Sequence, residues 1–261
     1  GSIFDLKPIS VGSLGSSFVY RYDGVKGSKQ YLPLTITLQT PDTDSANWQL
    51  HASAIWVSSI YLADHISELD IPSFSPPGIL ATDPVRILEL GASAGLPSIL
   101  ISKLFPSASV TVSDYPDDTL IDTLRRNVEA NDASQTCRVV PYAWGSDPTP
   151  VIERGGCFDI VIAADTLWNP DFHPIFIGSL AKTLKRRHSS RAHLIAGLHT
   201  GRYTIQRALE QAKLSGFEID RLVEREVDGS AVRPWSVNRD GEGDQERRRW
   251  VVWAKLKWAE V

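Results

Sequence analysis

Apolar and polar residues alternate in a regular order along most of the chain after residue 84. Short runs of Val, Ile, Leu and Ala, typical of buried strands, are followed by stretches in which apolar residues recur every three or four positions, typical of helices. This pattern predicts strands at 85–90, 109–113, 137–142, 158–163 and 192–198, and helices at 95–105, 117–131, 171–187 and 201–215. Such an order predicts an α/β fold with a doubly wound, Rossmann-like and mostly parallel sheet.

The end of the chain departs from this alternation. Leu222 to Val227 and Trp250 to Lys257 read as two strands joined by a long polar loop, without a helix long enough for a parallel crossover. We therefore expect an antiparallel last strand. Within the loop, Trp235 and the acidic stretch Asn238 to Glu246 form either a lid on the substrate side or an exposed connector.

The start of the chain has a different pattern. Alternating residues over Phe18 to Tyr22 and Tyr31 to Leu38 predict a β-hairpin, and an apolar stripe over His51 to Leu69 predicts an amphipathic helix. A Pro- and Ser-rich connector follows the helix. We expect residues 1–78 to form an N-terminal extension packed on the core, and residues 79–261 to form a single globular domain.

The first long strand leads into a glycine loop, E-L-G-A-S-A-G, that ends at Gly95. Glycines at positions 91 and 95 allow the backbone to turn sharply and to approach a ligand closely. Asp114 ends the next strand about twenty residues later, where a carboxylate can accept hydrogen bonds from both hydroxyls of a ribose. The spacing predicts a site for a cofactor that contains a nucleoside.

The loop lacks the third glycine of the G-x-G-x-x-G fingerprint that binds a pyrophosphate. Glu89 precedes it, and an acidic side chain repels phosphate and suits a cationic ligand. A purely structural strand-to-helix turn is the alternative, and the position of Asp114 at the next strand end disfavours it.

Three further strand ends carry side chains suited to a site. Trp144 follows the third strand, Asp165 the fourth and His199 the fifth, and ligands of such sheets bind at these ends. Trp144 could instead be a core aromatic residue, Asp165 a helix N-cap and His199 a structural residue. Agreement between several strand ends favours a site, in which His199 would act as a base if the nucleophile is a hydroxyl.

Composition restricts the class of protein further. The chain has 261 residues, a hydrophobic fraction of 42% and a net charge of -4, without a long Lys/Arg run. These values give no electrostatic reason to expect a nucleic acid or an anionic membrane as partner. The chain has only two cysteines, Cys137 and Cys157, which is too few for a disulfide framework and predicts reduced thiols and a cytoplasmic location. The sequence predicts no set of metal ligands.

An ordered set of motifs over residues 48–258 resembles methyltransferase family 16, one of the seven-strand S-adenosylmethionine-dependent methyltransferase families. Within that family it is most similar to the fungal nicotinamide N-methyltransferase-like branch. The motifs are Trp56, E-L-G-x-x-x-G, Val112 to Pro116, Leu124 to Val128, Trp144–Gly145, Ala164 to Asn169, and the closing strand Arg247 to Lys255.

The resemblance implies an N-methyltransferase that takes its methyl group from S-adenosyl-L-methionine. The acceptor it implies is a protein amine, N-terminal or lysine, because the branch includes an enzyme that modifies both on translation elongation factor 1-alpha. Asp165 and Trp168 are the expected catalytic residues. The expected cofactor-binding residues are Trp56, Glu89, Gly91, Ala92, Ser93, Gly95, Asp114, Tyr115, Trp144 and Ala164.

Two departures leave alternatives open. Lysine methyltransferases of the family carry D-x-x-Y after the fourth strand, whereas this chain has Trp168 in place of the tyrosine, and Ser93 stands where glycine is common. A small nitrogenous molecule is therefore the first alternative as acceptor. A repurposed fold that binds the cofactor without transferring methyl is the second alternative.

Overall fold

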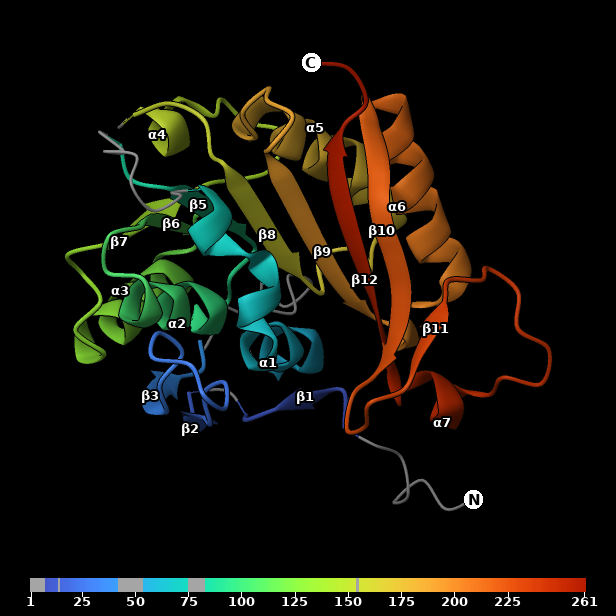
Figure 1. The fold of residues 1–261 in the computed structure, drawn as a ribbon, viewed down its shortest axis with the longest axis horizontal. Helices are drawn as coiled ribbons and strands as arrows, with labels where there is room; N and C mark the ends of the chain where they lie inside the picture. Colours follow the sequence, from blue (N-terminus) through green and yellow to red (C-terminus); the bar gives the residue numbers. More distant parts are fainter. Residues whose placement is uncertain (1–7, 14, 42–53, 75–82, 154) are drawn as a thin grey trace.

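An eight-stranded sheet forms the centre of the computed structural model, which describes residues 8–13, 15–41, 54–74, 83–153 and 155–261 (Figure 1). In order across the sheet, the strands are β11 (Val232–Pro234), β10 (Phe217–Glu226), β12 (Trp250–Trp258), β9 (Arg191–Gly197), β8 (Ile160–Ala164), β5 (Arg86–Leu90), β6 (Ser109–Asp114) and β7 (Cys137–Pro141). Strands β7, β6, β5, β8 and β9 are parallel. Strand β12 runs antiparallel between β9 and β10.

The prediction of a doubly wound, mostly parallel sheet with an antiparallel last strand is confirmed. Strand β11 is an addition to the seven strands expected, and it lies within the predicted long polar loop. It pairs with the outer edge of β10, where Arg233 lies opposite Glu224. Three residues are too few to show the alternation of apolar and polar positions that predicts a strand, and Val232 is exposed. Strand β11 therefore depends on pairing with the edge of β10.

Helices cover both faces of the sheet (Figure 1). The α-helices are α1 (Val57–Asp64), α2 (Leu96–Leu104), α3 (Asp118–Ala130), α4 (Thr149–Ile152), α5 (His173–Thr183), α6 (Arg202–Leu214) and α7 (Asp244–Arg247). The 3-10 turns are η3 (Ile66–Leu69), η4 (Ile71–Phe74), η5 (Pro170–Phe172) and η6 (Leu198–Thr200). None of the helices in the described part of the chain is long and apolar enough to cross a bilayer.

Two apolar cores result, one on each face of the sheet. Strand β8 shows the division: Ile160 and Ile162 belong to the core with α1, α2 and α3, whereas Val161 and Ala163 belong to the core with α5 and α6. Because successive side chains of a strand point to opposite faces, a continuous apolar run is what a strand covered on both sides requires. This explains why the central strands are readable as unbroken apolar runs.

The predicted helix at 51–69 is shorter than expected. Residues 51–53 lie outside the described part, and Ile55–Trp56 form a short strand, β4, that pairs antiparallel with β1 (Ser10–Val11). The helix therefore starts only at Val57, and the chain continues as η3 after Asp64. Ile55 and Trp56 fit the apolar stripe of a helix equally well, so only pairing with a distant segment decides between the two structures.

The helix predicted at 171–187 also ends early, at Thr183. Leu184 leaves the helix with extended geometry and pairs in a parallel bridge with Phe158, and the amide of Lys185 donates to the carbonyl of Phe158 at 2.8 Å. This pairing extends the sheet beside β8, and it competes with continuation of the helix.

The predicted N-terminal hairpin is present as β2 (Ser17–Tyr22) and β3 (Leu34–Gln39). Asn127 of α3 and the C-cap residue of that helix, Asn131, pair with the backbone of β3: Asn131 with Thr37, and Asn127 with Gln39. The Asn127 amide also donates to the carbonyl of Ala94 at 3.0 Å. One side chain thus joins the hairpin, α3 and the glycine loop.

We expect Asn127→Ala to lower the free energy of unfolding by about 1–3 kcal/mol, because it removes the partner of the part-buried backbone groups of Gln39 and of the buried carbonyl of Ala94. Urea unfolding followed by tryptophan fluorescence measures this change. Arg126→Ala on the exposed side of α3 is the matched control, and it should shift the midpoint only slightly. An equal effect of both variants would contradict the bridging role.

The polar loop between β10 and β12 is fastened by buried ion pairs. Glu224, fully buried, accepts from Arg202 and Arg233, and Glu242 of the loop accepts from the same two arginines at 2.6–2.9 Å. Trp235 donates to Gln206 of α6. The loop is therefore held against α6 and β10, rather than projecting as a loose connector.

Candidate active site

The main cavity lies where the strand order reverses, beyond the carboxyl ends of β5 and β8. From β5 the chain moves outward to β6 and β7, and it then returns to β8 on the other side. Loops on the two sides of such a reversal separate and leave a crevice in which ligands bind. The crevice holds two adjoining cavities, which share Trp56, Gly91, Ser93 and Ala164. The larger encloses about 800 Å³ including its mouth, in the range of small-molecule sites.

The glycine loop has backbone geometry that its sequence explains. Gly91 has a φ of 70°, and an added Cβ would lie 3.0 Å from both Trp144 and Thr166. Gly95 has a φ of 83°, and an added Cβ would lie 2.6 Å from Leu124. Ser93 also adopts a left-handed conformation, with a φ of 50°, which accounts for the frequent glycine at this position.

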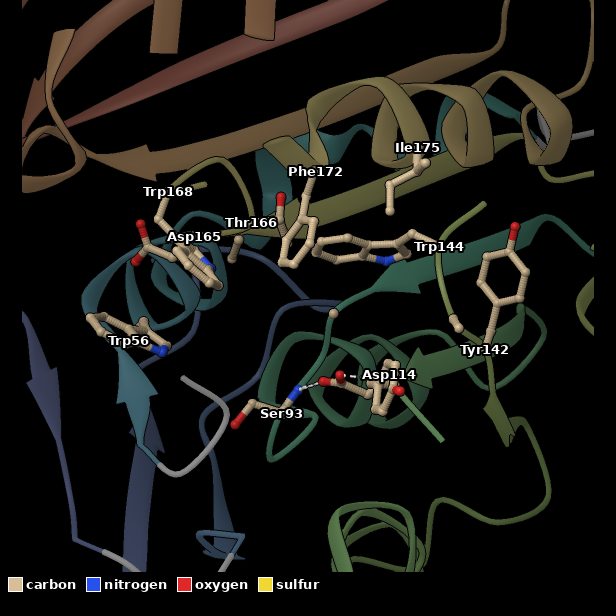
Figure 2. A pocket seen from close by; sticks show the side chains of 14 residues that line it. Trp56, Ser93, Asp114, Tyr142, Trp144, Asp165, Thr166, Trp168, Phe172 and Ile175 are labelled. Carbon is tan, nitrogen blue, oxygen red and sulfur yellow. Dashed lines mark hydrogen bonds between the residues drawn. The ribbon is translucent and has the colours of Figure 1, made fainter. Parts of the chain in front are cut away.

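Asp114 ends β6 with its carboxylate held by two backbone amides. The amide of Ser93 donates to one oxygen at 2.6 Å, and the amide of Tyr115 donates to the other at 2.7 Å (Figure 2). Burial raises the pKa of Asp114 to about 6, against the lowering effect of these hydrogen bonds. Each oxygen keeps a lone pair for a ligand, so the carboxylate is oriented in advance for two hydroxyl donors.

Glu89 lies below the loop and lines the smaller cavity. Its side chain is buried, and one oxygen accepts from the amide and the hydroxyl of Ser98 at 3.1 and 2.5 Å. Burial raises the pKa of Glu89 to about 8, and the nearby Asp114 carboxylate contributes in the same direction. No lysine or arginine stands among the described lining residues of either cavity.

Asp165 follows β8 in a left-handed conformation with a φ of 54°. Its carboxylate accepts from the amide of Gly197 at 2.7 Å and from the amide of Ser58 in the first turn of α1 at 3.3 Å. Asp165 thus caps α1 from another part of the chain, and it also lines the main cavity. The N-cap of the turn after β8 is Asn169 rather than Asp165, so Asp165 is not the local helix cap that the sequence allowed.

Aromatic side chains form much of the remaining wall. Trp144 packs edge-on against Phe176, with ring centroids 4.9 Å apart, and also faces the cavity. Figure 2 shows Trp56, Asp165 and Trp168 at one end of the cavity, with Trp144 lying between Phe172 and Ile175. The two ends therefore differ: one is aromatic with a single carboxylate, and the other combines Trp144 with Asp114.

His199 lies behind this wall. Its ring stacks on Trp56 with centroids 5.7 Å apart and planes 11° apart, and His199 is absent from the described lining residues. Burial lowers the pKa of His199, against the raising effect of Asp165. His199 supports Trp56 in this arrangement, which agrees with the structural alternative for a lone histidine.

All twelve residues expected from the sequence line one or both cavities. Glu89, Ala92 and Gly95 lie on the smaller cavity, and the others lie on the larger one or on both. Five lining residues of the larger cavity were not among those expected: Tyr142, Ala143, Thr166, Phe172 and Ile175. Phe172 and Ile175 belong to the turn and helix after β8, where their apolar spacing resembles that of core residues.

The residues present fit S-adenosylmethionine and do not fit a dinucleotide. S-adenosylmethionine carries a sulfonium, an ammonium and one carboxylate. The cavities offer three buried carboxyl groups, Glu89, Asp114 and Asp165, without a basic side chain in their described lining. A pyrophosphate would meet uncompensated negative charge here. Gly91 leaves space for close approach of the ligand.

The sheet order and this acidic, glycine-lined crevice define an S-adenosylmethionine-dependent methyltransferase. The chain belongs to methyltransferase family 16, because the model of that family, described as lysine methyltransferase, matches residues 35–207, more than half of the chain. The family model supports an enzyme whose methyl donor is S-adenosyl-L-methionine, and it does not favour the alternative of a repurposed fold.

Two relatives and one solved structure agree with this assignment. The protein N-terminal and lysine N-methyltransferase efm7 of Emericella nidulans is 28% identical over 218 residues, which cover 78% of this chain and 80% of the relative. The enzyme of the same name from Schizosaccharomyces pombe is 30% identical over 184 residues, covering 67% and 68%. The METTL16 methyltransferase domain shares the fold, with a TM-score of 0.51, 13% identity and coverage of 77% and 69%.

Proposed function

We propose that this enzyme methylates amines of a protein substrate, at the N-terminus or on a lysine, and that translation elongation factor 1-alpha is a candidate target. The printed names of the relatives support a protein acceptor. The observation that carries the proposal is the aromatic end of the cavity, which is lined by Trp56, Trp168 and Asp165 (Figure 2).

The cofactor supplies a methyl group on a positively charged sulfur, which a neutral nitrogen attacks in line. We propose that Glu89, Asp114 and the glycine loop hold the cofactor, with Trp144, Tyr115 and Ala164 against its adenosyl part. Ala92, Ser93 and Gly95 shape the loop around it. Trp56 and Trp168 exclude water from the acceptor, and Asp165 orients the amine through a hydrogen bond.

An aromatic acceptor site favours amines that lose their proton easily. Burial disfavours the ammonium form, and an N-terminal amine has an ordinary pKa near 8 compared with about 10.4 for lysine. Near neutral pH a far larger fraction of the N-terminal amine is therefore neutral. We expect the N-terminal amine to be the better acceptor at pH 7, since His199 does not reach the cavity as a base.

Three peptides with the N-terminal sequence of elongation factor 1-alpha test this proposal: one with a free α-amine and its lysines acetylated, one with an acetylated α-amine and free lysines, and one with both blocked. We expect methyl label in the first two peptides only. The rate for the first peptide should level off near pH 8, whereas the rate for the second should rise towards pH 10. Label found only in small molecules of a lysate would contradict a protein acceptor.

Trp168→Ala addresses the acceptor end separately. We expect kcat/KM for the free α-amine peptide to fall about tenfold, because water enters and the amine is less desolvated, while the Kd for S-adenosylmethionine changes less than about twofold. Trp168→Tyr, the residue common in the family, is the matched variant, and it should retain most of the activity. Loss of cofactor affinity equal to the loss of activity would place Trp168 at the cofactor instead.

We also propose that residues 1–78 are an extension of one methyltransferase unit, 79–261, rather than a separate domain. Apolar residues of the hairpin, such as Ile36 and Leu38, share a core with Ile101 and Val110. The free thiols Cys137 and Cys157 suit a reducing compartment, and we propose that the enzyme works in the cytoplasm.

A further inference from the structure

The hydroxyl of Ser179 joins helix α5 to the turn that carries Trp144. The phenol of Tyr142 donates to it at 3.0 Å and the amide of Gly145 at 2.8 Å, and it donates in turn to the carbonyl of Ile175 at 2.9 Å. A serine hydroxyl offers one donor and two acceptor positions, and here all three are used. Ser179 is fully buried and is absent from the described lining of both cavities. It therefore acts on a ligand only through the residues that it holds.

The turn from Tyr142 to Gly145 packs directly on α5. Among the residues that the structure describes, the amide of Gly145 has no acceptor other than the Ser179 hydroxyl. Gly145 has a φ of 84°, and an added Cβ would lie 3.1 Å from the Cβ of Ile175. The ring of Trp144 meets Phe176 of the same helix edge-on, with centroids 4.9 Å apart. The helix thus supports the ring of Trp144 on the side away from the cavity.

The start of the same turn is fixed at the sheet. The amide of Tyr142 donates to the carbonyl of Asp114 at 2.8 Å, and Ser146 closes the turn by donating to the carbonyl of Ala143. Figure 2 shows Trp144 and Asp114 on the same part of the cavity wall. The position of the ring relative to the carboxylate is therefore set by a turn that is anchored at Asp114 and at α5.

We propose that Ser179 is a positioning residue that holds Trp144 in place against the adenine of bound S-adenosylmethionine. This inference rests on the proposed contact of Trp144 with the adenosyl part. A ring that is already held needs no ordering when the ligand binds, and such pre-organisation strengthens binding. Without the hydroxyl, the amide of Gly145 and the phenol of Tyr142 lose their shared acceptor, so the turn that carries Trp144 loses its fixed position.

Ser179→Ala in the full chain tests this inference, and Thr183→Val is the matched control. Thr183 lies one turn further along α5, is fully buried, and donates to the carbonyl of Ser179 at 2.9 Å, as Ser179 does to that of Ile175. Each variant loses one buried hydroxyl of the same helix, but only Ser179 holds the Trp144 turn. In isothermal titration with S-adenosylmethionine we expect Ser179→Ala to raise Kd about three- to tenfold, and Thr183→Val to stay within about twofold of the wild type.

Kinetics and a double variant separate positioning from a general loss of structure. At saturating cofactor, Ser179→Ala should keep kcat for the free α-amine peptide within about twofold while its KM for the cofactor rises, because Asp165 and Trp168 belong to the turn after β8. Trp144→Ala should weaken cofactor binding at least as much as Ser179→Ala. In the Trp144→Ala background, Ser179→Ala should add no further loss, since its effect passes through that ring.

Unchanged affinity of Ser179→Ala, together with weaker binding by Trp144→Ala, would overturn the positioning role alone. An equal loss of affinity in Thr183→Val would also overturn it, and so would additive losses in the double variant, because affinity would then follow the stability of α5. Unchanged affinity of Trp144→Ala would overturn the proposed placement of the adenosyl part, and this inference with it.

Discussion

Asp114→Ala is expected to weaken S-adenosylmethionine binding by a factor of about 10² to 10⁴. Two hydrogen bonds from ribose hydroxyls to a buried carboxylate would be lost, and each hydrogen bond to a charged group contributes about 1.5–3 kcal/mol. The loss is large because Ser93 and Tyr115 already orient both oxygens of Asp114. Methyl transfer to any acceptor should fall to background at cofactor concentrations that saturate the wild type.

The pH dependence of binding gives an independent check on Asp114. Its pKa of about 6 in the ligand-free protein means that the carboxylate is protonated below this pH and then accepts fewer hydrogen bonds. Affinity should therefore fall as the pH drops below about 6, and Asp114→Ala should lack that fall. Asp118→Ala, at an exposed carboxylate on α3, is the control and should bind normally.

Replacing Asp114 by asparagine is also expected to weaken cofactor binding. Each carboxylate oxygen faces an amide N–H, from Ser93 or from Tyr115, so an Asn side chain must place its own NH2 group against one of these donors. We expect it to bind the cofactor little better than the alanine variant. Affinity near that of the wild type would show that charge and acceptor geometry at position 114 are unimportant.

The segment from β5 to β6 could be predicted closely because its information is local. Glu89, Gly91, Gly95 and Asp114 lie within one strand–loop–helix–strand unit, so the turn geometry and strand ends fix their relative positions. The same holds for Ala164 and Asp165, which directly follow an unbroken apolar strand. A parallel sheet places the carboxyl ends of its strands at one edge, and the predicted site was inferred from the residues at these ends.

Other features depended on pairing between distant segments. Trp56 was expected within a helix, but Ile55–Trp56 pair with β1, and α1 begins one residue later. The first turn of α1 gains its hydrogen bond from Asp165, which is 107 positions away. Neither contact leaves a periodic pattern in the sequence.

The buried Glu89 carboxyl makes the ligand-free enzyme less stable at neutral pH, and we expect the bound cofactor to compensate for this. Its pKa of about 8 in the folded protein lies above the ordinary value of 4.5. The folded state thus binds the proton more tightly than the unfolded state, and stability is highest below about pH 4.5 and declines as the pH rises towards 8. At pH 7 the cost reaches about 3 kcal/mol.

Glu89→Gln is therefore expected to stabilise the ligand-free protein at pH 7 by up to about 3 kcal/mol and to flatten its stability profile between pH 4.5 and 8. The same change should weaken S-adenosylmethionine binding about ten- to a hundredfold, since a neutral amide cannot pair with the ammonium of the cofactor. Urea unfolding at several pH values and isothermal titration measure the two effects. Glu129→Gln, at an exposed glutamate, should change neither.

Proton release distinguishes this explanation from a general loss of packing. At pH 7 Glu89 is largely protonated in the ligand-free protein, and it must ionise to pair with a cation, so binding should release up to about one proton per cofactor. Titrations in buffers of different ionisation enthalpy count that proton. In Glu89→Gln the release should disappear, whereas in Ser98→Ala it should persist, because the carboxyl group remains. A wild type that binds without releasing a proton would show that Glu89 does not face the ammonium, and the cation would then have to be balanced by Asp114 or Asp165.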